Sequence, residues 1–330
     1  MDAKRFYFQN TQSKPEMNKV KILRYVVCPC CRSSLRFSRR KLYCRNCNKF
    51  FEFTPEGIPS LLGHIDRDTQ LSLDKWDNIF GSSFFKKESE KEYREFFLAD
   101  TKRQILEAAP KSKIKDRVFL EMGCGQGFLG EAMAKEGWFF LGVDFSLNAL
   151  KLLKKRLDKR EIYNYLLVQG NVESMPIKNG SIDLLFGGGV IEHFENAQTV
   201  INNVYRVLKR DGVAVNALPF FNLGNLVYRS LWGGIPNVPI LKQIAELVHI
   251  KILGGKHMVF GYELQLTFSQ LRSLHQRAGF RRENIKISKF DTHIQLHRIK
   301  SQFLRKIVIM LCNKSSLFWP AIKVVANKGK

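Results

Sequence analysis

Short apolar runs alternate along the chain with longer segments whose apolar residues recur every three to four positions. The runs predict β-strands and the longer segments predict amphipathic helices, such as 147–157 with its leucine stripe. The predicted strands are 118–120, 138–143, 165–168, 181–186, 213–218, 285–287 and 321–326. This order predicts an α/β fold: a doubly wound, mostly parallel, seven-stranded Rossmann-like sheet.

The first β-α-β unit, 118–144, carries the clearest chemical signal. Its first strand is followed by Gly123, Gly125 and Gly127, and its second strand ends at Asp144, 21 residues after Gly123. Glycines let a ligand approach the backbone, and the helix behind them aims free N–H groups at it. A carboxylate roughly 20 residues further on suits the hydroxyls of a ribose. The unit therefore predicts a nucleoside-derived ligand.

Two nucleoside ligands compete for this unit. Gly125, Gly127 and Gly130 match the G-x-G-x-x-G pattern of dinucleotide-binding proteins. However, Glu121 stands directly before the turn, where a carboxylate opposes a pyrophosphate but suits the ammonium of an amino acid. Gly130 falls inside the predicted helix, where packing on the neighbouring strand explains it. We therefore read the motif as E-x-G-x-G-x-G, from Glu121 to Gly127.

On these residues the chain resembles the class I S-adenosylmethionine-dependent methyltransferases, most closely their type 11 branch, over about 115–218 and again at 267–280. Glu121 would hold the ammonium group, Asp144 the ribose, and Asn171 with Val172 the adenine. Asn171 replaces the acid that is usual in the family, and its amide oxygen can accept the same bond. The cofactor-binding residues implied are Glu121, Gly123, Gly125, Gly127, Asp144, Phe145, Asn171, Val172 and Gly188.

The stretch after the fourth predicted strand lies beside the reactive methyl group in the resembling family. Here it contains Glu192 and His193, and His193 is the only histidine near the site by sequence. It is the candidate catalytic residue, which would remove a proton from the acceptor; the alternative is that it only shapes the wall of the site. Magnesium-binding members carry a carboxylate where this chain has Gly189, so we expect no metal at the active centre.

Two C-x-x-C pairs near the N-terminus predict a zinc ribbon. Cys28, Cys31, Cys44 and Cys47 have the spacing of a tetrahedral site with four thiolates, whereas Cys30 is left outside it. The segment resembles the ribbon at the front of ribosomal RNA guanine methylases and the stand-alone ribbon that activates several tRNA and rRNA methylases. Its basic residues could contact RNA phosphates, or the ribbon could only pack on the catalytic domain.

These elements predict four regions. They are a flexible N-terminus at 1–20, the zinc ribbon at 21–63, a helical cover at 64–114, and the methyltransferase domain at 115–330 with an insertion at 219–266 and an amphipathic helix at 299–312. In the resembling family, an insertion after the fifth strand usually builds the acceptor pocket or a lid.

Charge adds a question about partners. The 54 Lys and Arg against 30 Asp and Glu give a formal charge of +24, which favours RNA or an anionic membrane surface, although lysine-rich helices can simply be solvated. No apolar run approaches the roughly 20 residues that span a bilayer, so we expect a cytoplasmic protein. The helix at 299–312 would place it peripherally on a membrane, or would pack into the core.

Three functional hypotheses remain. The first is transfer of a methyl group from S-adenosylmethionine to an O or N atom of a small-molecule or lipid-linked acceptor. The second is methylation of tRNA or rRNA, with the zinc ribbon gripping phosphates. The third, a non-catalytic cofactor-binding scaffold, fits less well because the cofactor motifs are nearly complete.

Overall fold

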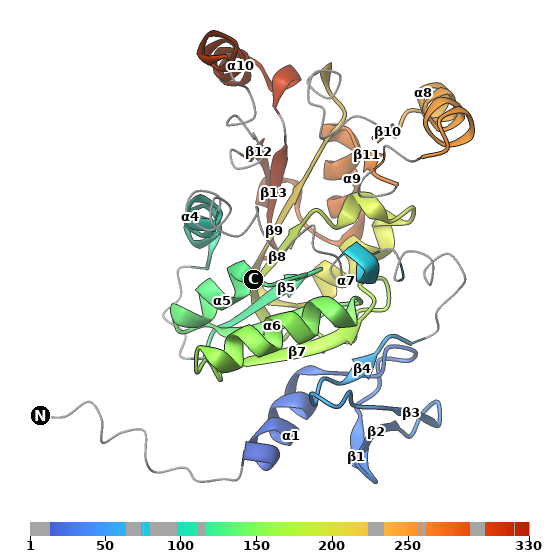
Figure 1. Cartoon of the computed structure of the whole chain (residues 1–330), viewed down its shortest axis with the longest axis vertical. Helices are drawn as coiled ribbons and strands as arrows, with labels where there is room; N and C mark the ends of the chain where they lie inside the picture. Colours follow the sequence, from blue (N-terminus) through green and yellow to red (C-terminus); the bar gives the residue numbers. More distant parts are fainter. Residues whose placement is uncertain are drawn as a thin grey trace, which may run out of the picture.

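The computed structural model describes residues 14–63, 74, 76–79, 98–110, 116–223, 234–255, 258, 262–290, 301–319 and 321–329, without the side chains of 14–19 and 305 (Figure 1). Parts of the predicted helical cover, insertion and amphipathic helix therefore lie outside the described residues. None of the described helices is long and apolar enough to cross a membrane.

The central sheet confirms the predicted fold. Its strand order is β12-β13-β9-β8-β5-β6-β7-β4, and β13 alone runs antiparallel to its neighbours. All seven predicted strands are present, and the short β4 adds an eighth by pairing in parallel with β7. The bounds are β4 Ser60–Leu61, β5 Val118–Met122, β6 Phe139–Asp144, β7 Tyr165–Gly170, β8 Ile182–Gly188, β9 Leu208–Leu218, β12 Ile285–Lys289 and β13 Ile322–Asn327.

Helices cover both faces of this sheet, which explains why its strands are apolar on both sides. Phe119 and Phe140 pack with α4 (Leu98–Ala108), α5 (Phe128–Lys135) and α6 (Leu147–Lys159). The next residues along the same strands, Leu120 and Leu141, pack on the opposite face with α7 (Ala197–Val207) and α9 (Phe268–Ala278). Two apolar layers therefore hold the strand ends that carry the candidate site.

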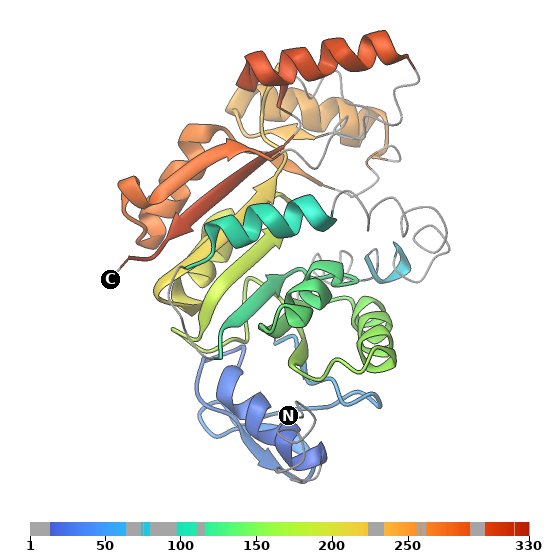
Figure 2. The same cartoon turned by 90° about the vertical axis from the view of Figure 1, so that its left-hand side faces the viewer.

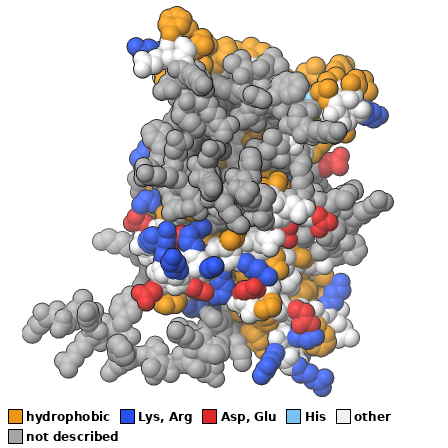
Figure 3. All heavy atoms as spheres, in the orientation of Figure 1, with side chains coloured by type: hydrophobic (Ala, Val, Ile, Leu, Met, Phe, Trp, Pro, Cys, Tyr) orange, Lys and Arg blue, Asp and Glu red, His pale blue; other side chains and the backbone are white. Residues whose placement is uncertain are grey.

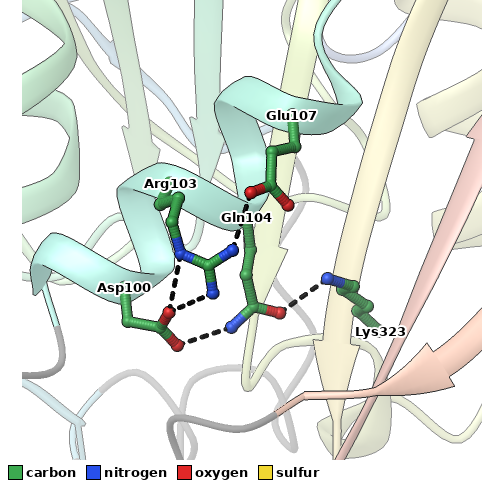
Figure 4. A network of polar contacts seen from close by, with 5 residues as sticks. All are labelled: Asp100, Arg103, Gln104, Glu107 and Lys323. Carbon is green, nitrogen blue, oxygen red and sulfur yellow. Dashed lines mark hydrogen bonds and ion pairs between the residues drawn. The ribbon is translucent and has the colours of Figure 1, made fainter.

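Helix α4 is tied to β13 of the sheet by one polar network (Figure 4). The buried Gln104 accepts a hydrogen bond from Lys323 of β13 and donates one to Asp100. Arg103 bridges Asp100 and Glu107 on the outer face of the helix. The described end of the predicted helical cover is thus packed on the sheet.

The ribbon segment is joined to the main core. Helix α1 (Lys14–Tyr25) begins inside the range predicted as flexible, and β1 (Arg36–Ser38), β2 (Lys41–Cys44) and β3 (Lys49–Phe51) form an antiparallel sheet. Tyr25 stacks on Phe139 of β6 with 5.0 Å between ring centroids, and Val26 bridges Ile177. With β4 in the central sheet, the ribbon is held by contacts at several points.

Helix α8 of the insertion and helix α10 of the tail lie at the opposite pole from the ribbon, and the chain then returns to the sheet as β13 (Figures 1 and 2). The insertion contains β10 (Ile235–Pro236), α8 (Pro239–Glu246), which continues as the π-helix η7 (Leu247–Ile252), and β11 (Leu264–Gln265). The predicted amphipathic helix is α10 (Gln302–Lys314), followed by η11 (Ser316–Phe318).

Candidate functional site

The glycine turn follows β5 at the carboxyl edge of the sheet. Gly123, Gly125 and Gly127 all have positive φ, at 61°, 47° and 57°. A Cβ on Gly123 would lie 2.6 Å from Val190 Cγ2, and one on Gly127 would lie 2.4 Å from Leu153 Cδ2. Positive φ favours glycine at all three positions, and the close contacts at Gly123 and Gly127 leave little room for a Cβ. The turn leads directly into α5.

Gly130 has a different role. It lies inside α5, and a Cβ there would come within 2.0 Å of the Phe140 ring. Gly130 is therefore explained by close packing of α5 on β6, as the sequence predicts, and not by contact with a ligand.

Asp144, at the end of β6, is joined to the glycine turn. Its Oδ2 accepts a hydrogen bond from Gly125 N at 2.7 Å, and its Oδ1 accepts one from Ser146 N at 2.8 Å. Burial raises the pKa of this carboxyl to about 6, against the lowering effect of the backbone hydrogen bonds. The residue predicted to bind ribose thus lies at the turn predicted to approach the ligand.

Asp77 is a second carboxylate at this place, and sequence reasoning missed it. Ser146 Oγ donates to Asp77 Oδ1, and Asn148 N donates to the same oxygen at 3.2 Å. The negative charge of Asp77 also contributes to the raised pKa of Asp144. The only signal in the sequence was that Asp77 falls in the predicted helical cover.

Glu121 lies under the turn, with its side chain against α5. It is buried, and its Oε2 accepts a hydrogen bond from Gly130 N at 2.9 Å. Burial raises the pKa of this carboxyl from its ordinary value of 4.5 to about 8. This hydrogen bond ties the end of β5 to α5, and the ammonium-binding role of Glu121 stays a prediction.

The raised pKa of Glu121 predicts how stability depends on pH. Between about pH 4.5 and 8 the folded protein keeps a proton on Glu121 that the unfolded chain releases. The free energy of unfolding should therefore fall as pH rises through this range, and Glu121→Gln should flatten that fall. Urea unfolding at several pH values measures this, with the exposed Glu107→Gln as control. An unchanged slope in Glu121→Gln would contradict the assignment.

The residues predicted to bind adenine and the reactive centre follow the neighbouring strands. Asn171 Oδ1 accepts from Glu173 N at 2.9 Å, and Val172 O accepts from Asn203 Nδ2 at 3.1 Å. The Phe145 carbonyl accepts a hydrogen bond from Gln169, and Gly188 is the last residue of β8. All of them follow or end parallel strands at the same edge as Asp144, where ligands of such sheets bind.

His193 is placed by the short helix η4 (Ile191–His193) after β8. Its Nδ1 lies 3.1 Å from the carbonyl oxygen of Tyr262, and its ring meets Trp76 edge-on with 5.5 Å between centroids. A carbonyl only accepts hydrogen bonds, so Nδ1 carries a hydrogen and Nε2 is the basic nitrogen of the neutral ring.

Glu263 completes a cluster that the sequence did not reveal. Glu192, His193 and Glu263 each bring a carboxylate oxygen or ring nitrogen within 4.8 Å of the others. Glu192 is 1% exposed, and burial, followed by the charge of Glu263, raises its pKa well above the ordinary range. The sequence led us to expect no metal at the active centre, because Gly189 stands where magnesium-binding members have a carboxylate. That expectation considered only the loop after β8, whereas Glu263 comes from the insertion.

The four predicted zinc ligands converge in the ribbon. The Sγ atoms of Cys28 and Cys47, and those of Cys31 and Cys44, are 3.4 Å apart, and Cys31 and Cys47 are separated by 3.8 Å. Four thiolates bound at about 2.3 Å around a tetrahedral zinc ion lie about 3.8 Å from each other. The cluster therefore fits zinc, while the exposed Cys30 lies outside it near Lys49.

Comparisons with known proteins agree with this geometry. Residues 120–216 match the family model described as a methyltransferase domain. The chain is 28% identical over 150 residues to a demethylmenaquinone methyltransferase of Lactococcus lactis, covering 44% of this chain and 54% of that protein. It is 32% identical over 166 residues to a malonyl-[acyl-carrier protein] O-methyltransferase of Hamiltonella defensa, covering 49% and 62%.

One solved structure shows the same fold. It is a complex between the Haloferax volcanii Trm112 methyltransferase activator and a methyltransferase, with a TM-score of 0.50, 12% identity, and coverage of 77% of this chain and 98% of that chain. The chain spans little more than half the length of the first curated relative. Together with the strand order, these matches confirm the predicted resemblance to class I methyltransferases.

Proposed function

Starting from the class I methyltransferase domain in this chain, we propose that the protein transfers a methyl group from S-adenosylmethionine to an O or N atom of a small-molecule or lipid-linked acceptor. The observation that carries the proposal is the hydrogen bond between Asp144 and the backbone of Gly125. This bond joins the carboxylate predicted to bind ribose to a glycine-rich turn whose positive φ values favour glycine, which supports the proposal.

The chain's own residues divide the work of an in-line displacement. Asp144 binds the ribose hydroxyls, Asn171 and Val172 bind the adenine, and Glu121 serves the ammonium end. When bound, S-adenosylmethionine would supply the methyl group to the acceptor oxygen or nitrogen and would leave as S-adenosylhomocysteine. The acceptor proton passes to Nε2 of His193, whose ring is oriented by the Tyr262 carbonyl.

The nature of the acceptor is supported by two features. Among the relatives, one methylates demethylmenaquinone and one methylates malonyl-[acyl-carrier protein], both by their names. In this chain the insertion brings Tyr262 and Glu263 beside His193, where a lid over an acceptor would be built. Burial raises the pKa of Glu192 well above its ordinary range, which favours the protonated form that can donate a hydrogen bond to an acceptor oxygen.

We also propose that Cys28, Cys31, Cys44 and Cys47 hold a structural zinc ion. The metal would supply no chemistry to methyl transfer, because the four thiolates leave no open coordination position. Its contribution is to hold the ribbon's short strands together.

The function is tested by transfer of labelled methyl from S-adenosylmethionine to lipid, small-molecule, protein and RNA fractions of the native source. We expect label in the lipid or small-molecule fraction. His193→Gln should slow transfer without weakening cofactor binding, because it removes only the proton acceptor. Label in RNA alone would overturn the proposed acceptor, and label in no fraction would overturn the enzymatic proposal.

RNA methylation is the second candidate, and one observation favours it. Arg39 and Arg40 form the exposed two-residue turn between β1 and β2, with φ of 47° and 65°. This kind of turn favours Asn-Gly, and arginine is unusual in it. Two positive charges therefore lie at the tip of a strained turn. Lys41 is less available, because its Nζ pairs with Glu52 at 2.5 Å.

Replacing Arg39 by asparagine and Arg40 by glycine removes both positive charges and keeps the two-residue turn. Asn-Gly adopts the same turn with less strain, so we expect the thermal stability of the ribbon to rise. If the tip grips RNA, the slope of log affinity against log salt should also fall by about 0.7 for each phosphate that the tip no longer neutralises. RNA binding with an unchanged salt slope would exclude the tip as a phosphate grip.

A further inference from the structure

Helix α8 and its continuation η7 present an unusually apolar surface. Over residues 239–255 none of the side chains is buried, and the large apolar ones are well exposed, with Ile240 at 72% and Ile252 at 68%. The exposed set is Ile240, Leu241, Ile244, Leu247, Val248, Ile250, Ile252 and Leu253. Soluble proteins seldom leave so many large apolar side chains together in water, so this face marks an interaction site.

Helix α10 presents a second surface of the same kind. Phe303 is 73% exposed, and Leu304, Ile309 and Met310 are also exposed. Cys312 is buried, and its carbonyl accepts a hydrogen bond from Trp319. The Trp319 carbonyl accepts one from Asn222 in turn, so the end of the helix is fixed to the body. Core packing, the alternative weighed from the sequence, therefore explains only the inner part of the apolar stripe.

The two surfaces share one end of the molecule, away from the ribbon. Figures 1 and 2 place α8 and α10 at the same pole, and Figure 3 shows hydrophobic side chains gathered on both. We name them together the apolar pole: the exposed apolar residues of α8, η7 and α10. Two helices projecting at one pole can contact a single extended surface at the same time.

The exposed charged side chains described on α8, η7 and α10 are positive. Lys251, Lys306 and Lys314 are exposed on these elements. Helix α10 contains no acidic residue, and Glu246 is the only one in 239–255. Glu246 faces the body, because its Oε1 accepts a hydrogen bond from Tyr262 and lies 3.8 Å from Lys242 Nζ. The pole therefore combines apolar contact with positive charge.

We propose that the apolar pole binds the surface of an anionic lipid bilayer, with α8–η7 and α10 lying in the interface. Apolar side chains flanked by lysine suit the boundary between acyl chains and anionic headgroups. A second copy of the chain suits it less, because a symmetric contact would bring the same lysines together on both sides.

Tyr262 links this surface to the candidate site. Its hydroxyl donates to Glu246 on α8, and its carbonyl contacts His193. Tyr262 therefore connects a bilayer bound at α8 with the proposed proton acceptor, His193. A lipid-linked acceptor would enter the site from this side. This link to the acceptor rests on the proposed function, whereas bilayer binding does not depend on methyl transfer.

The test is flotation of the full chain with vesicles, without cofactor or acceptor. We expect binding to phosphatidylcholine vesicles that contain phosphatidylglycerol, weaker binding to phosphatidylcholine alone, and a decrease with added salt. Ile244→Asp on α8 and Phe303→Asp on α10 should each weaken binding about tenfold or more. Both side chains are exposed, so these variants should fold.

The matched control is Val20→Asp, which places the same charge at a 67% exposed apolar residue of α1 in the ribbon segment, and which should bind like the unmodified protein. The proposal would be overturned if the protein bound neither kind of vesicle, or if all variants bound the vesicles equally well. A dimer in sedimentation velocity that Ile244→Asp dissociates, without vesicle binding, would assign the pole to a second copy instead.

Discussion

Replacing Asp144 by alanine is expected to weaken S-adenosylmethionine binding by about 1 to 3 kcal/mol, because the variant cannot form charge-assisted hydrogen bonds to the ribose. Isothermal calorimetry measures the change directly. Asp144 also accepts hydrogen bonds from Gly125 and Ser146, so the fold of the variant is checked by thermal unfolding. Asp144→Asn keeps the shape of the side chain, so its affinity for S-adenosylmethionine should lie between those of the unmodified protein and Asp144→Ala.

The raised pKa of Asp144 gives the same prediction a second readout. A carboxylate accepts two ribose hydroxyls, whereas its protonated form has to use one oxygen as a donor. Cofactor affinity should therefore decline as pH falls through about 6, and Asp144→Asn should lose that decline. Unchanged affinity in Asp144→Ala would remove the ribose assignment. Tight binding of NAD would restore the dinucleotide interpretation of the glycine turn.

The parts of the fold that follow from local pattern could be predicted. Phe119 and Leu120 face opposite layers, yet both are apolar, which is typical of a parallel strand buried on both faces. The glycine turn is equally local, because positive φ is required at Gly123, Gly125 and Gly127 themselves. The prediction that Gly130 packs against a strand followed from its place inside a helix.

The parts that depend on distant segments could not be predicted. Asp77 reaches Asn148 across 71 residues, and Tyr262 reaches His193 across 69 residues. Strand β4 joins β7 although it lies within the segment predicted as the ribbon, 21–63. Each residue has an ordinary local context, and its role arises only when the fold brings two segments together. The exposure of α10 could not be predicted either, because an apolar stripe on a helix fits a protein core and a bilayer surface equally well.

The largest expected effect concerns the ribbon. Replacing Cys28 and Cys47 together by serine should abolish binding of one zinc ion per chain and unfold the ribbon. Binding of structural zinc contributes about 10 to 16 kcal/mol in finger peptides, far more than the few buried side chains of this segment, such as Leu35 and Leu42, can replace. Elemental analysis measures the metal, and proteolysis of residues 21–63 reports the unfolding.

Loss of zinc should also destabilise the methyltransferase domain, because the ribbon packs against it. Tyr25 stacks on Phe139, and Leu61 of β4 is fully buried beside β7. Unfolding the ribbon exposes these side chains to water, so the thermal midpoint of the whole chain should fall in the double variant and stay unchanged in Cys30→Ser. Zinc lost from Cys30→Ser would show that the ligands are wrongly assigned. An unchanged midpoint in a zinc-free double variant would show that the domain stands without its ribbon.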